Sequence, residues 1–218
     1  MRALILDFDG LVMDTETTDF ESWLAVYGLF GVELPRKEWV LGIGSDGRAL
    51  NPGARLSAET GRPEEELRKC RREIRDALVA DLQPLPGVRE WLEEASALGL
   101  RLGIASSSPS WWVKGHLERV GLAEHFEVLA GAEDVDRVKP DPAVYRVALQ
   151  RLGVAPDEAL ALEDSPNGLA AARAAGILCL AVPGPMTAEL SFEGARLLLR
   201  SLEDRSLASV LDELRAAV

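Results

Sequence analysis

The sequence predicts an α/β fold, a doubly wound parallel sheet core with an inserted all-helical segment, on three observations. Short apolar runs alternate with longer amphipathic stretches, which is the pattern of βα units. Between about residues 17 and 82 the alternation stops, and the patterns found there are helical. Several apolar runs end at polar side chains, as expected where parallel strands end at a ligand site.

Five strands are expected, over residues 3–8, 100–106, 126–131, 159–164 and 178–182. Asp7 lies near the end of the first, Ser106 ends the second, and Glu163 and Asp164 end the fourth. Ligands of open parallel sheets bind outside the carboxyl ends of the strands. We therefore expect these four side chains to converge, although they are far apart in the sequence.

Two helices between the later strands have recognisable starts. For one, Asp141 is the expected N-cap, Pro142 the first helical residue and Gly153 the stop. For the other, Ser165 is the expected N-cap and Pro166 the first helical residue. These signals place a helix after each of two candidate strands, which is consistent with βα units.

The helical insertion divides the chain into two expected domains. Residues 1–15 and 83–218 are assigned to the sheet core, and residues 16–82 to the insertion. The segment QPLPG (83–87) is expected to be a hinge or linker, since it holds two prolines and a glycine. The charged run 62–76 is interpreted as a salt-bridged, solvated helix.

Composition excludes several classes of function. The 218-residue chain has a formal net charge of −12, which argues against a nucleic acid or an anionic membrane as partner. The two cysteines, Cys70 and Cys179, lie far apart and are interpreted as reduced thiols. No apolar run approaches the ~20 residues that span a bilayer. We therefore expect a cytoplasmic protein, monomeric or weakly homodimeric, without membrane or nucleic-acid partners.

The segment LILDFDGLVMDTE places Asp7, Asp9, Asp14 and Glu16 within ten positions of one another. Carboxylates this close repel one another and are costly to desolvate unless a cation lies among them. The segment therefore indicates a metal site. Asp164, at the end of another expected strand, can supply a distant oxygen ligand, and oxygen ligands favour Mg²⁺.

The same residue types suit phosphoryl transfer. Asp7 is a plausible nucleophile that would form an aspartyl phosphate, and Asp9 is placed to give and take a proton. Ser106 and the amides of Ser107 and Ser108, near the start of a helix, can hold phosphate oxygens. Lys139 supplies the positive charge that an incoming phosphate needs among so many acids.

Four segments in order, DFDGLVMD, IASSS, KPDP and LEDSPNG, resemble the motifs of the haloacid dehalogenase superfamily, and the insertion resembles its helical cap. Within that superfamily the sequence is most similar to the group that holds β-phosphoglucomutase and small sugar-phosphate or nucleotide phosphatases. The resemblance implies a Rossmann-like core. It also implies Mg²⁺-dependent hydrolysis of a small phosphorylated metabolite through an aspartyl phosphate.

The resemblance also implies a role for each motif residue. Asp7 would be the nucleophile and a metal ligand, and Asp9 the acid/base and a metal ligand through its backbone carbonyl. Asp164 would be a further metal ligand, and Glu163 would support it from the outer shell. Ser106 and Lys139 would bind the phosphate. True dehalogenases of the family lack the second aspartate, so Asp9 favours phosphorus chemistry.

The insertion offers four candidates for substrate specificity, Thr15, Asp19, Ser45 and Arg48. Relative to the mutase pattern, Asp19 stands in place of a hinge histidine, Leu41 of a lysine and Ser45 of an arginine. These differences favour a hydrolase over a phosphosugar mutase, although Arg48 lies close enough to substitute in part for the arginine.

A function of another class is a phosphoaspartate signalling module, which needs similar acids, Mg²⁺ and a lysine. The helical insertion favours the enzyme, because a lid excludes water from a reaction and a phosphoacceptor needs no lid. The DFDG segment is also compatible with a plain turn or a calcium loop, but Leu11 stands where a calcium loop needs a polar ligand.

Residues outside the motifs are interpreted as structural. Trp111 and Trp112 are expected to pack the root of a helix, and His116 and His125 to be surface or packing residues. Asp14 either ties down the loop at the start of the insertion or reaches the metal site through water.

Overall fold

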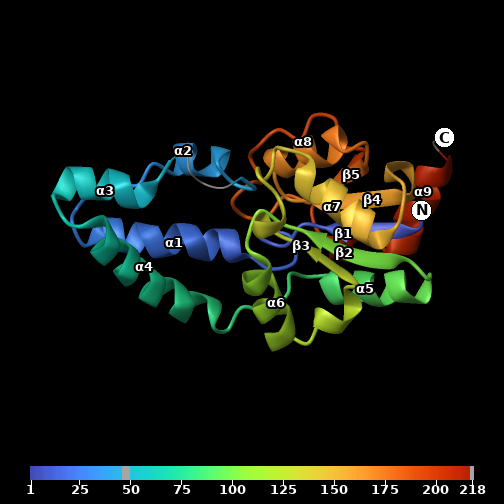
Figure 1. Ribbon diagram of the computed structural model, residues 1–218, viewed down its shortest axis with the longest axis horizontal. Helices are drawn as coiled ribbons and strands as arrows, with labels where there is room; N and C mark the ends of the chain where they lie inside the picture. Colours follow the sequence, from blue (N-terminus) through green and yellow to red (C-terminus); the bar gives the residue numbers. More distant parts are fainter. Residues whose placement is uncertain (46–49, 217–218) are drawn as a thin grey trace.

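The structure is a computed structural model that describes residues 1–45 and 50–216. Its described strands form one parallel sheet with the order β3-β2-β1-β4-β5-β6 (Figure 1). The strands are β1 Ala3–Leu6, β2 Arg101–Ala105, β3 Val128–Ala130, β4 Ala159–Glu163, β5 Leu178–Ala181 and β6 Leu197–Leu198. The chain starts at the centre of the sheet and builds outward on both sides, so the expected doubly wound α/β fold is confirmed.

Each of the five expected strands is present but shorter than expected, and β6 was not expected at all. β6 has two residues, pairs with β5 at the edge of the sheet, and exposes 61% of Leu198. A strand this short and this exposed has too few apolar residues to produce a pattern in the sequence.

Residues of β1 alternate between the two faces of the sheet. Leu4 and Leu6 pack with helices α5, α6 and α9, whereas Ala3 and Ile5 pack with α7 and α8. Both faces are therefore covered by helices. These helices are α5 Val88–Ala97, α6 Ser110–Arg119, α7 Ala143–Leu152, α8 Pro166–Ala174 and α9 Leu207–Ala216. Short 3-10 turns lie at Ala123–His125, Ala132–Asp134, Pro156–Glu158 and Leu202–Asp204.

The helix starts are close to those expected. In α8, Pro166 is the first helical residue and the Ser165 hydroxyl accepts a hydrogen bond from the backbone N–H of Gly168 at 3.1 Å, as expected for an N-cap. In α7, the expected start is one residue too early. The carbonyl of Pro142 accepts the first helical hydrogen bond, from Arg146, and this places Pro142 at the cap and not inside the helix.

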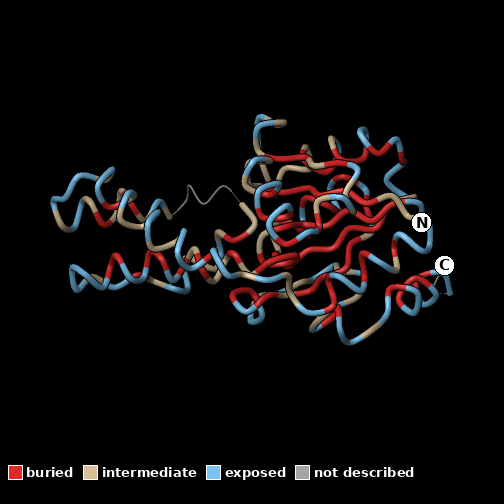
Figure 2. The backbone as a smooth tube through the Cα atoms, turned by 90° about the horizontal axis from the view of Figure 1, so that it is seen from below, coloured by how far each residue is buried: buried red, intermediate tan, exposed pale blue. Residues whose placement is uncertain are grey.

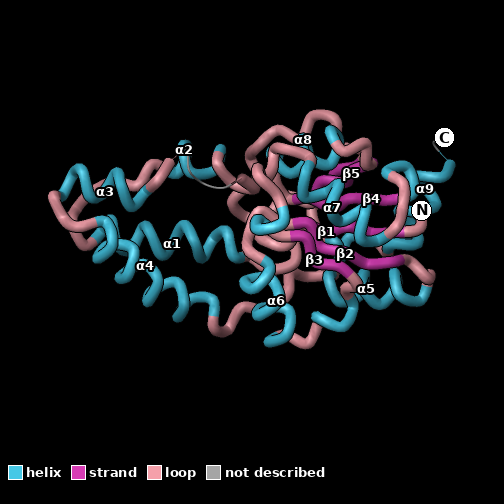
Figure 3. The backbone as a smooth tube through the Cα atoms, viewed as in Figure 1, coloured by secondary structure: helices cyan, strands magenta, loops and turns pink. Residues whose placement is uncertain are grey.

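Five described helices lie between β1 and β2, and the first four of them project from one end of the sheet (Figures 1 and 3). These four are α1 Thr15–Gly28, α2 Arg36–Leu41, α3 Pro52–Thr60 and α4 Glu64–Val79. The described part of this insertion contains helices and turns, as expected. Its helices bury their own apolar cluster, which includes Trp23, Tyr27, Leu56 and Leu67. Figure 2 shows this smaller buried region beside the large one in the sheet. We call these four helices the cap.

The two chain segments that join the cap to the sheet lie side by side. Met13 forms a β-bridge with Pro84, and the N–H of Leu85 donates to the carbonyl of Val12 at 2.9 Å. Asp14 is the N-cap of α1 and accepts from the N–H of Thr17 at 3.1 Å, which supports its structural interpretation. The chain therefore enters and leaves the cap at one point.

Among the described helices the longest is α4, with 16 residues, and none combines the length and apolar character that crossing a membrane requires. Both cysteines are free thiols, Cys179 being buried in β5 and Cys70 half-buried in α4.

Candidate active site

The carboxyl ends of the central strands bring together the residues that the motifs singled out. Asp7 follows β1, Glu163 ends β4 and Asp164 follows it, and β1 and β4 are neighbours in the sheet. Lys139 reaches this point from the loop before α7, with only 1% of its surface exposed. Its ammonium forms ion pairs with Asp7 and with Glu163, the latter at 2.7 Å.

Burial shifts the pKa values of this pair. Removal from water, together with the charges of Glu163 and Asp9, raises the pKa of Asp7 to about 8 even though Lys139 opposes the shift. Burial by itself would lower the pKa of Lys139. The carboxylates of Asp7 and Glu163 more than offset that effect, so its pKa is raised and it stays an ammonium.

Tyr145 of α7 completes this network, although it lies outside the four sequence motifs. Its hydroxyl donates to the same oxygen of Glu163 that accepts from Lys139, and the ammonium lies 5.1 Å from the centroid of its ring. A buried tyrosine needs a partner for its hydroxyl. A tyrosine on the apolar face of the helix after KPDP could therefore have indicated a hydrogen bond to this network from the sequence.

The buried carboxylates suit a divalent cation. Oxygen atoms of Asp7, Glu163 and Asp164 lie within 4.8 Å of one another. Three carboxylates face one ammonium, which leaves two negative charges if all three are ionised. Among the described residues, Asp164 Oδ1 and Glu163 Oε2 are buried without a hydrogen-bond partner. Burial and the charge of Asp7 raise the pKa of Asp164 well above its ordinary range. A hard cation with oxygen ligands would neutralise the surplus negative charge and would bind the carboxylate oxygens that have no hydrogen-bond partner.

Two glycines permit the close approach of backbone to these acids. Gly10 has a φ of +86°, and a Cβ there would overlap the carboxylate of Asp164. A Cβ at Gly168 would overlap the carboxylate of Glu163. The glycines of DFDG and SPNG are therefore required by the site and not only by turns.

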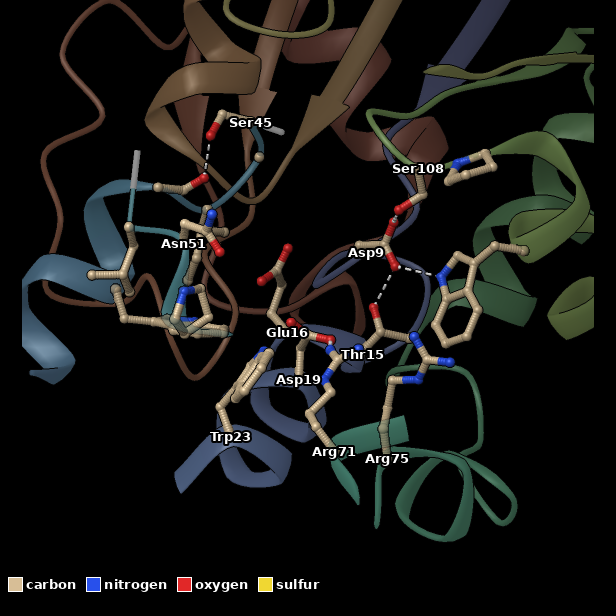
Figure 4. Close-up of a pocket in the computed structure, with 18 of the residues that line it drawn as sticks. Asp9, Thr15, Glu16, Asp19, Trp23, Ser45, Asn51, Arg71, Arg75 and Ser108 are labelled. Carbon is tan, nitrogen blue, oxygen red and sulfur yellow. Dashed lines mark hydrogen bonds and ion pairs between the residues drawn. The ribbon is translucent and has the colours of Figure 1, made fainter. Parts of the chain in front are cut away.

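Asp9 accepts hydrogen bonds from four described side chains, of which Figure 4 labels Thr15 and Ser108. Its Oδ1 accepts from the hydroxyl of Thr15 at 2.6 Å and from the indole N–H of Trp112 at 3.0 Å. Its Oδ2 accepts from the hydroxyls of Ser108 at 2.6 Å and Ser106 at 3.3 Å. The carboxylate is thus directed toward the turn after β2 and the start of α6.

The cap touches the sheet domain close to this turn. The hydroxyl of Ser107 donates to the carbonyl of Gly44 at 2.8 Å. The side-chain amide of Asn167 donates to the carbonyls of Ile43 at 2.8 Å and Leu41 at 3.2 Å. The hydroxyl of Ser107, a residue expected at the phosphate, is therefore used to dock the loop that follows α2.

A cavity of about 600 Å³ lies between the cap and the turn after β2. Asp9, Thr15, Asp19 and Ser45 line it, whereas Arg48, the remaining specificity candidate, lies outside the described residues. The cavity is rich in aromatic side chains. Four of the five tryptophans of the chain line it, namely Trp23, Trp39, Trp111 and Trp112.

Three arginines of α4, Arg68, Arg71 and Arg75, also line the cavity, although they belong to the charged run that was expected to face solvent. The interpretation of 62–76 as a solvated run is wrong for two of them, since the side chains of Arg71 and Arg75 are only 12% and 20% exposed. Arg71 forms an ion pair with Asp19 of α1. Spacings of three and four residues put the arginines on one helix face, which was the available signal.

Glu16 extends from the first turn of α1 into the cavity (Figure 4). Burial, followed by the charges of Asp9, Asp7 and Asp14, raises the pKa of Glu16 well above its ordinary range. Glu16 is one of the four acids clustered after the first strand, and it lies where a ligand in the cavity would meet it.

The two tryptophans at the start of α6 differ. Trp111 is 69% exposed at the cavity and does not pack the root of the helix as expected. Trp112 packs against the core as expected, and its indole also contacts Asp9. The ring of His116 packs against that of Trp112 with centroids 4.2 Å apart, so its interpretation as a packing residue is confirmed.

Comparison with known proteins agrees with this geometry. Residues 4–182 match the family described as haloacid dehalogenase-like hydrolase, and this range includes all four motifs. The chain belongs to this family. The expected superfamily and the expected hydrolase class are therefore confirmed.

Individual members of the family are similar over most of their length. The chain is 41% identical over 218 residues to YhcW of Bacillus subtilis (strain 168), with 99% of each protein covered. It is 33% identical over 178 residues to the phosphorylated carbohydrates phosphatase of Thermotoga maritima, covering 81% of this chain and 82% of that protein. The crystal structure of CbbY from Rhodobacter sphaeroides in complex with phosphate is similar with a TM-score of 0.77 and 31% identity, covering 95% of this chain and 98% of that one.

Replacing Lys139 by Met should destabilise the protein by about 3–5 kcal/mol, because it leaves buried carboxylates without their cation. The matched control is Tyr145→Phe, which removes one hydrogen bond from the same network and should cost about 1 kcal/mol. Urea unfolding in the presence of a chelator measures both free energies. Equal losses in the two variants would show that Lys139 is not what stabilises the acids.

Proposed function

We propose that this chain is a Mg²⁺-dependent phosphomonoester hydrolase that acts on a small phosphorylated carbohydrate through an aspartyl phosphate on Asp7. The observation that carries the proposal is the pairing of Asp7 with Lys139 at the end of β1, beside a capped cavity. Asp9 lines this cavity with its carboxylate held by four donors.

In the first half-reaction, a carboxylate oxygen of Asp7 forms a bond to phosphorus while the bond from phosphorus to the ester oxygen breaks. The electron pair of that bond stays on the leaving oxygen, which takes a proton from Asp9 and departs as an alcohol. In the second half, Asp9 takes a proton from water as the water oxygen attacks phosphorus. Inorganic phosphate leaves and the carboxylate of Asp7 is restored.

The phosphate would be held by groups of this chain from two sides. Ser106 and the backbone amide of Ser107 lie at the turn before α6 and would bind phosphate oxygens, whereas the N–H of Ser108 donates to the Ser106 hydroxyl at 2.9 Å. Lys139 contributes positive charge from the side of Asp7. Ser107 would contribute through its backbone, because its hydroxyl is bound to Gly44.

The residues that would hold Mg²⁺ are Asp7, Asp164 and the backbone carbonyl of Asp9. Glu163 would act from behind them, since one of its oxygens is already shared by Lys139 and Tyr145. When bound, Mg²⁺ supplies the positive charge that neutralises phosphate oxygens during transfer.

We assign residues 16–82 to a cap domain, and 1–15 with 83–218 to the catalytic core. The paired connection at Met13 and Pro84 would be the hinge. A cap in the position seen here excludes water from the site, which suits an enzyme and not a phosphoacceptor module.

The carbohydrate part of the proposal is supported by the name of the Thermotoga maritima relative and by the cavity itself. Tryptophan faces can pack against the apolar side of a sugar ring, and Glu16 and Asn51 can bind its hydroxyls. Specificity would be set with Thr15, Asp19 and Ser45. The cytoplasmic location and the oligomeric state stay predictions of the sequence.

The mutase alternative is less well supported. The position of a hinge histidine in mutases is held here by Asp19, which is paired with Arg71. The arginines of α4 do bring cations into the cavity, which the sequence analysis did not expect. The two activities are therefore best separated by a direct assay.

Asp7→Asn should lower phosphate release by several orders of magnitude, because it removes the nucleophile and keeps its shape. The assay is hydrolysis of p-nitrophenyl phosphate and of a panel of sugar phosphates. The matched control is Asp212→Asn, at an exposed position of α9, which should keep the wild-type rate. A variant at Asp7 with a tenth of the wild-type rate would rule out the covalent mechanism.

Removal of divalent cations should abolish hydrolysis, and Mg²⁺ should restore it. Mg²⁺ should also raise the Tm of the wild type, because a ligand that binds only the folded state stabilises it. In Asp164→Asn the shift in Tm should be lost at the same Mg²⁺ concentration. Full activity in excess chelator, or an unchanged shift in the variant, would contradict the assigned metal site.

Incubation with β-glucose 1-phosphate, Mg²⁺ and a trace of β-glucose 1,6-bisphosphate separates hydrolase from mutase. We expect free phosphate to appear without accumulation of glucose 6-phosphate, because water can accept the phosphoryl group. Rapid conversion to glucose 6-phosphate with little free phosphate would establish the mutase instead.

A further inference from the structure

Trp112 has a contact that its position in the sequence does not explain. It lies in the first turn of α6, outside the four motifs, yet its indole N–H donates to Asp9 Oδ1 at 3.0 Å. The role inferred from this contact rests on the proposed function, in which Asp9 is the acid that protonates the leaving oxygen.

The indole differs chemically from the other partners of Asp9. Thr15, Ser106 and Ser108 present hydroxyls, which can donate or accept a hydrogen bond, whereas an indole N–H can only donate. Of the four partners that the structure describes, Trp112 is therefore the one that only donates, and it favours Oδ1 as the unprotonated oxygen. The proton of Asp9 is then favoured on Oδ2, whose two described partners are hydroxyls.

Oδ2 is the oxygen on the side of the proposed phosphate site. It is bound by the hydroxyls of Ser108 at 2.6 Å and Ser106 at 3.3 Å, on the turn after β2. Both hydroxyls can turn to accept when Oδ2 is protonated. The indole thus directs the proton of Asp9 toward the turn that would hold the phosphate.

The position of the indole depends in turn on the cap. The guanidinium of Arg75, on α4, lies 4.8 Å from the centroid of the Trp112 ring, and His116 packs against the same ring. Arg75 is itself held by Asp76 at 2.9 Å. A cation over an indole face is attracted by the ring, so the cap helix and the indole hold each other in place.

We propose that Trp112 is a positioning residue for Asp9, and that Arg75 makes this positioning depend on the cap lying over the core. The proton on Asp9 Oδ2 passes to the leaving oxygen as its bond to phosphorus breaks and Asp7 bonds to phosphorus. Esters whose leaving group departs as a stable anion need this proton little. Esters of ordinary alcohols need it fully.

The test compares two substrates in Trp112→Phe, which keeps an aromatic ring and loses the N–H. For benzyl phosphate, with an alcohol leaving group, kcat/KM should fall roughly ten- to hundredfold, part of what general acid catalysis contributes. For p-nitrophenyl phosphate the fall should be less than about threefold, since its leaving group needs little protonation. An equal fall for both substrates would overturn the proposal, because a merely structural role affects both alike.

Arg75→Gln tests the link to the cap and does not alter the core. It should also lower kcat/KM more for benzyl phosphate than for p-nitrophenyl phosphate, but by a smaller factor than Trp112→Phe does. In the Trp112→Phe background it should add little, since the two residues would act through one path. If the falls in kcat/KM of the two single variants multiply in the double variant, the link between Arg75 and Trp112 is overturned. It is also overturned if Arg75→Gln lowers kcat/KM equally for the two substrates.

The wild type separates this inference from the proposed function. A wild type that hydrolyses neither ester would overturn the proposed function and this inference with it. One that hydrolyses p-nitrophenyl phosphate but not benzyl phosphate would overturn this inference and the role of Asp9 as acid, and would leave the aspartyl phosphate on Asp7 standing, because no proton would then reach the leaving oxygen.

Discussion

One buried ammonium among three buried carboxylates is the constraint on which the rest of this site depends. Lys139, Asp7 and Asp164 each expose 4% of their surface or less, and isolated charges at such depth cost several kcal/mol each. The charges are tolerated because they face one another at adjoining strand ends. Tyr145 fixes one of the acids with its hydroxyl, and Gly168 leaves room for it. The same surplus of negative charge makes the site suitable for a divalent cation.

The second constraint is that side chains of the cap and of the sheet domain both contribute to this site, although the cap contains none of the four motifs. The cap leaves and rejoins the core through two paired segments, and its loop after α2 is held by Asn167 and Ser107. Helix α4 then brings Arg75 over the ring of Trp112, which is bound to Asp9. Side chains of the cap and of the sheet domain therefore meet around the carboxylate of Asp9. This makes the position of Asp9 sensitive to the position of the cap.

Part of the site could be predicted because it depends directly on topology. Asp7, Ser106 and Asp164 come at or just after the ends of predicted strands, and the ends of parallel strands meet at one edge of a sheet. Trp112 could not be predicted in this way, because a tryptophan at a helix start is compatible with plain packing. Arg71 and Arg75 were hidden for a similar reason, since a run of mixed charge on a helix is most simply explained by ion pairs with solvent-facing neighbours.

The sequence by itself determined the fold class, the helical insertion and which polar residues stand at the strand ends, because these depend on short-range periodicity and on the order of residue types along the chain. Tertiary structure alone decided which donors hold Asp9, which face of α4 lines the cavity, and how the cap loop docks on the core. The physical reason is that periodicity defines the faces of a helix but not what they contact. A partner across 103 residues, as for Trp112 and Asp9, exists only once both elements are packed on the same sheet.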